Sequence, residues 1–104
     1  MSTMTLAEIN QDIHAMDEEL WHYEARYGLR TAYFYELYKA GQLSDEDSIE
    51  ARDHSDWAAC YEIKQHREQL YDTLVREALE KVEAQHPISL ARLDLTSTPT
   101  AVGT

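Results

Sequence analysis

Two pairs of acidic and histidine residues have the spacing of metal ligands on a helix. Glu19 and His22 show the Glu-x-x-His spacing of carboxylate-bridged di-iron bundles, and Glu62 and His66 lie one helical turn apart further along the chain. A chain with 20 acidic residues and five histidines produces such spacings by chance, and the neighbours of His22, Leu20 and Tyr23, suit a packed interior. The sequence favours no bound metal or cofactor and keeps a ferritin-like metal-binding bundle as an alternative.

The sequence contains none of the common catalytic motifs. His14, His54 and His86 share no zinc-site spacing with Cys60, and the three glycines, at positions 28, 41 and 103, are too scattered for a phosphate-binding loop. No serine has the flanking glycines of a nucleophile elbow. We therefore expect a protein that is not an enzyme.

The charge of the chain restricts its partners. Its 20 acidic and nine basic residues give a formal net charge of -11. Nucleic acid and anionic membranes are polyanions, so neither is an expected partner, and a basic protein is the natural complement. The same charge leaves open a second alternative, an acidic inhibitor that mimics nucleic acid.

Length and cysteine usage indicate a single cytoplasmic domain. The chain has 104 residues and one cysteine, Cys60, which excludes an intrachain disulfide and fits a reducing compartment. Neither a signal peptide nor a membrane-spanning stretch is indicated by the hydropathy pattern. We expect Cys60 to act as a buried small apolar residue.

A long helix is predicted over residues 5–40. Thr5 and Glu8 fit a capping box, and Gly41 is suited to end the helix. Large residues follow at alternating spacings of three and four, which is typical of a helix with one packed face. This series comprises Leu6, Ile9, Ile13, Met16, Leu20, Tyr23, Tyr27, Arg30, Phe34 and Leu37.

A second helix of similar length is predicted over residues 45–85. Ser44 is its expected N-cap, and His86-Pro87 its end. Two helices joined by a short turn predict an all-α, coiled-coil-like antiparallel hairpin over residues 5–86. Residues 1–4 form an extension and residues 87–104 a loosely ordered tail, of which the apolar part, residues 88–95, could dock as a short strand or irregular segment.

The expected pairing of the two helices explains one charged residue on the apolar stripe. Arg30 falls opposite Asp56, with Asp53 one turn away, so we expect these three residues to form a clamp that fixes the register. The same pairing places Gly28 opposite Trp57 or Ala58, and the Trp57 indole would cover the bare backbone.

The first helix carries a second stripe of aromatic and small residues, so a lone hairpin leaves an apolar face uncovered. This stripe comprises Trp21, Ala25, Gly28, Ala32 and Tyr35. We expect a homodimeric four-helix bundle, a complex with another protein, or both. The expected anchors of the contact are Trp21, Tyr35, Trp57, Tyr61 and Tyr71.

The central part of the chain resembles small helical-hairpin proteins of prokaryotes. The resemblance lies in Tyr27-Gly28, Phe34-Tyr35, the run from Gly41 to Asp45, and the segment from Asp53 through Trp57 to Tyr61. Many such proteins look like antitoxin-type partners of toxin and antitoxin modules. The resemblance implies a regulatory protein that works by binding a cognate partner from the same operon.

Overall fold

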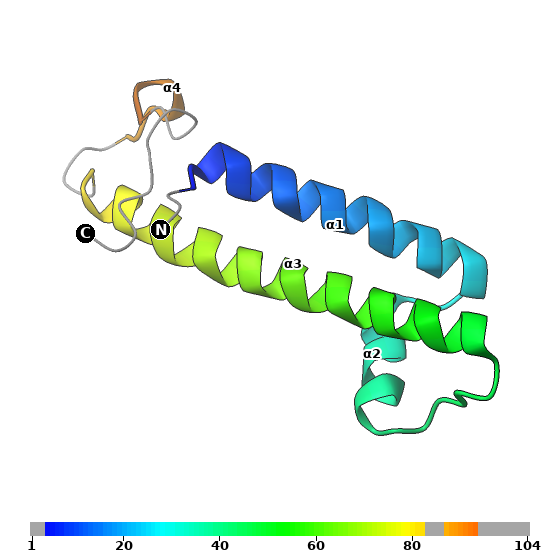
Figure 1. The fold of residues 1–104 in the computed structure, drawn as a ribbon. Coiled ribbons are helices and arrows are strands. Elements are labelled where there is room, and N and C mark those ends of the chain that lie inside the picture. The colour runs from blue at the N-terminus through cyan, green and yellow to red at the C-terminus, as the bar shows by residue number, and fades with distance from the viewer. Residues whose placement is uncertain (1–3, 83–86, 94–104) are drawn as a thin grey trace. The chain divides into compact units, whose positions relative to one another are not determined.

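The structure, a computed structural model, describes residues 4–82 and 87–93. Four helices follow one another: α1 (Leu6–Tyr27), α2 (Thr31–Lys39), α3 (Ser48–Glu80) and the short α4 (Leu90–Leu93). No β-strand occurs in this described part, so the all-α prediction is confirmed. The chain forms two compact units, residues 14–65 and residues 1–13 with 66–104, and α1 packs on α3 (Figure 1).

The predicted start of the first helix is confirmed by its hydrogen bonds. The Thr5 amide donates to Glu8 Oε1 at 2.8 Å, and the Glu8 amide donates to Thr5 Oγ1 at 3.0 Å. This reciprocal pair is a capping box, which satisfies backbone donors that have no partner within the helix.

The predicted continuous helix over residues 5–40 is wrong, because the chain breaks after Tyr27. Gly28 has a φ of 69°, in the left-handed region, and its amide donates to the Glu24 carbonyl at 2.8 Å. This bond closes α1 in the manner of a glycine C-cap. A Cβ placed on Gly28 would meet nothing within 4 Å, so the expected cover by Trp57 is also wrong. Gly28 therefore serves to end a helix, not to allow the close approach of another side chain to the backbone.

A carboxylate from α1 caps the start of α2. Arg30 occupies the N-cap position of α2 in an extended conformation, and its side chain makes no capping hydrogen bond. Glu24 Oε2 instead accepts from both the amide and the hydroxyl of Thr31, each at 2.8 Å. A negative charge at a helix N-terminus is favourable, so Glu24 fixes where α2 leaves the break.

The connection from α2 to α3 is longer than the predicted short turn. Gly41 ends α2 as predicted, with a φ of 68° and the two bonds of a Schellman motif, Gly41 N to Tyr38 O and Gln42 N to Leu37 O. The expected N-cap Ser44 is wrong. Asp47 Oδ1 accepts from the amides of Ile49 and Glu50, so α3 begins at Ser48 and runs to Glu80. Residues 83–86, which include the predicted end of the second helix at residue 85, lie outside the described residues.

Residues 14–65 enclose a core centred on Trp57. Its side chain is 1% exposed and lies among buried residues from all three helices, Leu20, Phe34 and Ala58. Phe34 stacks on the indole at 3.8 Å between ring centroids, and Tyr23 and Tyr27 stack at 5.6 and 5.8 Å. Burying this much aromatic surface is the main favourable contribution to folding in this unit.

The other unit has a smaller core formed by the start of α1 and the end of α3. Leu6, Ile9 and Leu74 are buried in it. In the C-terminal segment, α4 replaces the expected strand or irregular segment, and Leu90 is 74% exposed. Residues 94–104 lie outside the described part. No helix of the described chain is long and apolar enough to cross a membrane.

The break at Gly28 predicts whether a substitution there raises or lowers the free energy of unfolding. Gly28→Ala should lower the free energy of unfolding by about 1 kcal/mol, because an alanine is strained at positive φ. Gly28→Asn should cost less, since asparagine tolerates the left-handed region. Urea denaturation followed by circular dichroism measures both. A rise in stability on Gly28→Ala would instead indicate a continuous helix, in which alanine is favoured over glycine by about 1 kcal/mol.

Candidate functional site

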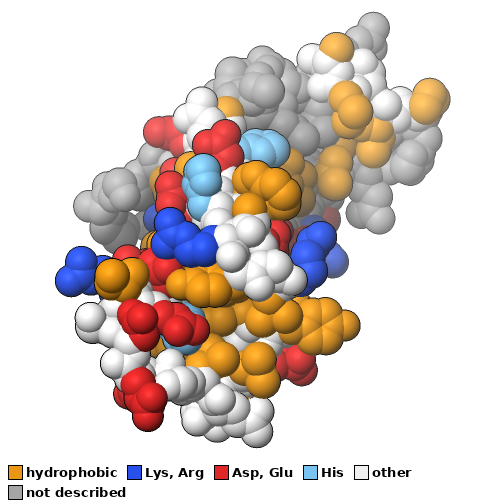
Figure 2. Space-filling view, turned by 90° about the vertical axis from the view of Figure 1, so that its right-hand side faces the viewer, with side chains coloured by type: hydrophobic (Ala, Val, Ile, Leu, Met, Phe, Trp, Pro, Cys, Tyr) orange, Lys and Arg blue, Asp and Glu red, His pale blue; other side chains and the backbone are white. Residues whose placement is uncertain are grey.

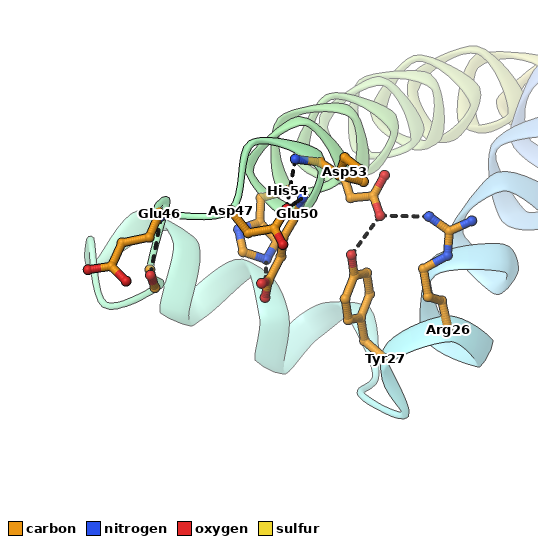
Figure 3. A network of polar contacts seen from close by, with 9 residues as sticks. Arg26, Tyr27, Glu46, Asp47, Glu50, Asp53 and His54 are labelled. Atoms are coloured by element: carbon orange, nitrogen blue, oxygen red, sulfur yellow. Dashed lines mark hydrogen bonds and ion pairs between the residues drawn. The ribbon is translucent and has the colours of Figure 1, made fainter.

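The predicted clamp is wrong in two of its three residues, because Asp53 pairs with Arg26 and Tyr27 rather than with Arg30 and Asp56. Asp53 Oδ2 accepts from Arg26 at 2.7 Å and from the Tyr27 hydroxyl at 2.6 Å (Figure 3). Arg30 points elsewhere, with Nε 3.6 Å from Glu24 Oε2 and a side chain that is 84% exposed. Asp56 is exposed. The clamp of Arg30, Asp53 and Asp56 is therefore corrected to one of Arg26, Tyr27 and Asp53.

The break between α1 and α2 explains why the predicted register is wrong. The predicted pairing of Arg30 with Asp56, continued along antiparallel helices, places Tyr27 near residue 59, but Tyr27 bonds Asp53, about two helical turns earlier on α3. In the other unit, the same predicted pairing places Arg67 level with Glu19, but Arg67 bonds Asp12 at 2.9 Å, about two helical turns earlier on α1. The predicted first helix ran to residue 40, whereas α1 ends at Tyr27 and α2 occupies part of the chain before α3. The α1–α3 pairing is therefore displaced by about two helical turns in each unit.

The clamp perturbs the titration of its members. The hydrogen bonds from Tyr27 and then Arg26 lower the pKa of Asp53. The bond to Asp53, with some burial, raises the pKa of Tyr27. Both shifts favour the observed state, with an ionised carboxylate and a neutral phenol, because each keeps the hydrogen bond intact.

A second set of contacts joins the α2–α3 connection to the core, and Figure 3 shows it beside the clamp. His54 is 7% exposed, its ring lies against Tyr27 and Phe34, and its Nε2 is 3.5 Å from Glu50 Oε1. The Glu50 amide in turn donates to Asp47, the N-cap of α3. These contacts fix the start of α3 and position the aromatic side chains around it.

The five expected partner-binding residues separate into four groups. Trp57 is buried in the core, so its prediction as a contact residue is wrong. Tyr71 packs partly buried against the smaller core. Trp21 is 64% exposed on α1. Tyr35 and Tyr61 are brought together, with ring centroids 4.9 Å apart in an edge-to-face arrangement.

Three tyrosines of α2 and α3 form a connected group that reaches the surface. Tyr35 contacts Tyr61 and also lies 6.5 Å from Tyr38, which is 36% exposed. We call Tyr35, Tyr38 and Tyr61 the tyrosine surface. The Tyr35 hydroxyl donates to Glu62 Oε2 at 2.6 Å, which raises the pKa of Tyr35 and holds its ring in place. The hydrogen bond and the ring contacts thus hold the group in place.

Hydrophobic and charged side chains also lie side by side at the end of residues 14–65 where α1 stops and α3 begins. Figure 2 shows hydrophobic side chains gathered across the middle of this face, with acidic side chains beside them.

The candidate metal ligands make other contacts or face outward. Glu19 and His22 are exposed on α1. Glu62 is bound to Tyr35, and a His66 ring nitrogen lies 3.2 Å from Arg67 Nη1. Among the described residues, no group of three or more His, Cys, Asp or Glu side chains could hold a metal ion.

Cys60 lies partly buried beside the Trp57 core. Burial, followed by the negative charges of Glu19 and Asp56, raises the pKa of its thiol. A thiol with a raised pKa is a poor nucleophile, so the packing role expected for Cys60 suits its surroundings.

Several important residues escaped the sequence prediction. Arg26 and Gly28 repeat the pattern of Lys39 and Gly41, a basic residue in the last turn followed by a glycine just beyond the helix. That repeat was the available signal for the end of α1. Tyr38 belongs to neither of the two stripes predicted for the first helix. Its absence from both stripes was the available signal that its side chain would be exposed.

Comparison with known proteins identifies no relative: no family model, curated protein or solved structure matches this chain.

The clamp predicts how stability depends on pH. The pKa of Asp53 is lowered on folding, so its contribution is complete above the unfolded value of about 4 and is lost as pH falls through the lower folded value. The loss of stability between pH 5 and pH 2 should therefore be smaller in Asp53→Asn than in the unchanged protein. Urea denaturation across this range measures it, with Asp45→Asn as the control for one lost charge. Parallel profiles for Asp53→Asn and the unchanged protein would contradict the clamp.

Proposed function

We propose that this chain is a non-enzymatic, protein-binding helical module that contacts its partner through the tyrosine surface. The observation that carries this proposal is the connected group of Tyr35, Tyr38 and Tyr61 on α2 and α3. Tyrosine is enriched in the energetically important part of protein interfaces, because it combines a large apolar ring with a polar hydroxyl.

Local order supports this use of the tyrosines. Tyr35 is fixed by its bond to Glu62, and Tyr38 rests against the buried ring of Phe34 at 5.6 Å between centroids. Side chains that are already ordered lose less conformational entropy on binding. The surface therefore requires little rearrangement to accept a partner.

The resemblance to antitoxin-type proteins and the net charge of -11 favour a basic cognate partner. An acidic protein attracts a basic one at long range, which accelerates association and discriminates against acidic partners. We propose a regulatory, antitoxin-like role in which a protein encoded in the same operon is the partner.

Self-association is proposed through a different surface. Trp21 is 64% exposed on α1, and Ala25, one turn further along the same stripe, is exposed as well. A small residue beside a large aromatic one allows close approach of a second helix, as in the predicted homodimeric four-helix bundle.

Two chains of charge -11 repel each other, so added salt should strengthen this dimer. Salt should weaken a complex with a basic partner.

The test is to co-express the chain with the product of the neighbouring gene and measure the complex. Tyr38→Ala should weaken binding by at least about tenfold, the effect of losing an interface hot spot. Tyr33→Ala is the matched control, since Tyr33 lies on the same helix and is 63% exposed. Isothermal titration calorimetry gives the affinity, and light scattering at two salt concentrations gives the oligomeric state. A monodisperse monomer that forms no complex with the neighbouring gene product would contradict the proposal.

A further inference from the structure

A cation already lies over one ring of the tyrosine surface. Lys39 Nζ is 5.8 Å from the centroid of the Tyr35 ring. This is within the range of a cation–π interaction, in which the negative face of the ring attracts a positive charge. Lys39 itself is exposed, so a partner can reach it.

A carboxylate lies at the edge of the same ring. The Tyr35 hydroxyl donates to Glu62 Oε2 at 2.6 Å, and Glu62 is exposed. An aromatic face combined with an adjacent carboxylate is a suitable site for a guanidinium group. The planar group can stack on the ring and donate hydrogen bonds to the carboxylate in the same pose.

We propose that the tyrosine surface binds an arginine side chain of its basic partner, which displaces Lys39 from the face of Tyr35 and pairs with Glu62. The inference rests on the proposed protein-binding function and specifies the chemistry of the partner. Arginine is preferred to lysine because an ammonium ion cannot stack and is more strongly hydrated.

Lys39 is then an internal competitor for the site. In the free protein it occupies the ring face that the partner's guanidinium requires, so binding must first move it. Removing its charge should therefore strengthen binding, beyond the general effect of making the protein more acidic.

The test uses two defined probes, a hexa-arginine and a hexa-lysine peptide, titrated by calorimetry in about 150 mM salt, where charges further apart than about 8 Å are largely screened. The unchanged protein should prefer the arginine peptide by about fivefold, or about 1 kcal/mol, because a guanidinium can stack on the ring and pair with Glu62 in one pose whereas an ammonium cannot. Tyr35→Phe should keep this preference, because the ring remains. Tyr35→Ala should abolish it, with circular dichroism to verify the fold.

Lys39→Gln provides the second variant, since an exposed lysine at the end of α2 can be replaced without disturbing the core. It should tighten arginine-peptide binding severalfold more than Lys81→Gln, which makes the same change of charge in the other unit. Equal affinity of the unchanged protein for the two peptides would overturn the inference. So would a preference that survives in a folded Tyr35→Ala variant, or equal effects of Lys39→Gln and Lys81→Gln.

The two proposals fail separately. A complex with the neighbouring gene product that weakens on Tyr38→Ala, together with no arginine preference, would retain the protein-binding function and reject the arginine site. An arginine preference lost in Tyr35→Ala, with no such complex, would retain the site and reject the proposed partner.

Discussion

The indole of Trp57 is the group on which the helical arrangement of residues 14–65 depends. It is 1% exposed, stacks on Phe34 of α2 and on Tyr23 and Tyr27 of α1, and belongs to α3. One side chain therefore joins three helices. Tyr35 contacts Tyr61 only while α2 remains packed on α3, and Tyr38 lies beside Tyr35 on the same helix. Any binding function of this surface therefore depends on the buried Trp57.

The polar edge of the indole imposes a second constraint. Trp57 Nε1 donates to Thr31 Oγ1 at 2.9 Å, and the Thr31 hydroxyl donates in turn to Glu24 Oε2 at 2.8 Å. Glu24 also accepts from the Thr31 amide. Each donor in this buried chain has an acceptor, which is the condition for burying polar groups without a large penalty. These hydrogen bonds hold α2 in place through its first residue, Thr31. The break at Gly28 separates α2 from α1, so that Thr31 can bond both Glu24 and Trp57.

The sequence was sufficient for features that depend on local chemistry. The capping box at Thr5 and Glu8, the glycine ending at Gly41 and the all-helical class all follow from short-range rules and agree with the structure. The break at Gly28 was missed because apolar spacing continues across it, through Tyr27 and Phe34. Once the break was missed, the register and the buried position of Trp57 could not be predicted, because both depend on long-range packing. The stripe on the first helix was sufficient to predict Tyr35 as a contact residue, whereas Tyr38 required knowledge of where α2 lies.

Hydrogen exchange of the two indole N–H groups, followed by NMR, tests the central role of Trp57 most directly. Trp21 is 64% exposed and serves as the internal reference, whereas the Trp57 N–H is buried and bonded to Thr31. The structure predicts rapid exchange at Trp21 and strong protection at Trp57, with that protection reduced in Thr31→Val, which removes the acceptor, and largely kept in Thr31→Ser. Similar, rapid exchange of both indoles in the unchanged protein would contradict this account of how α2 is held.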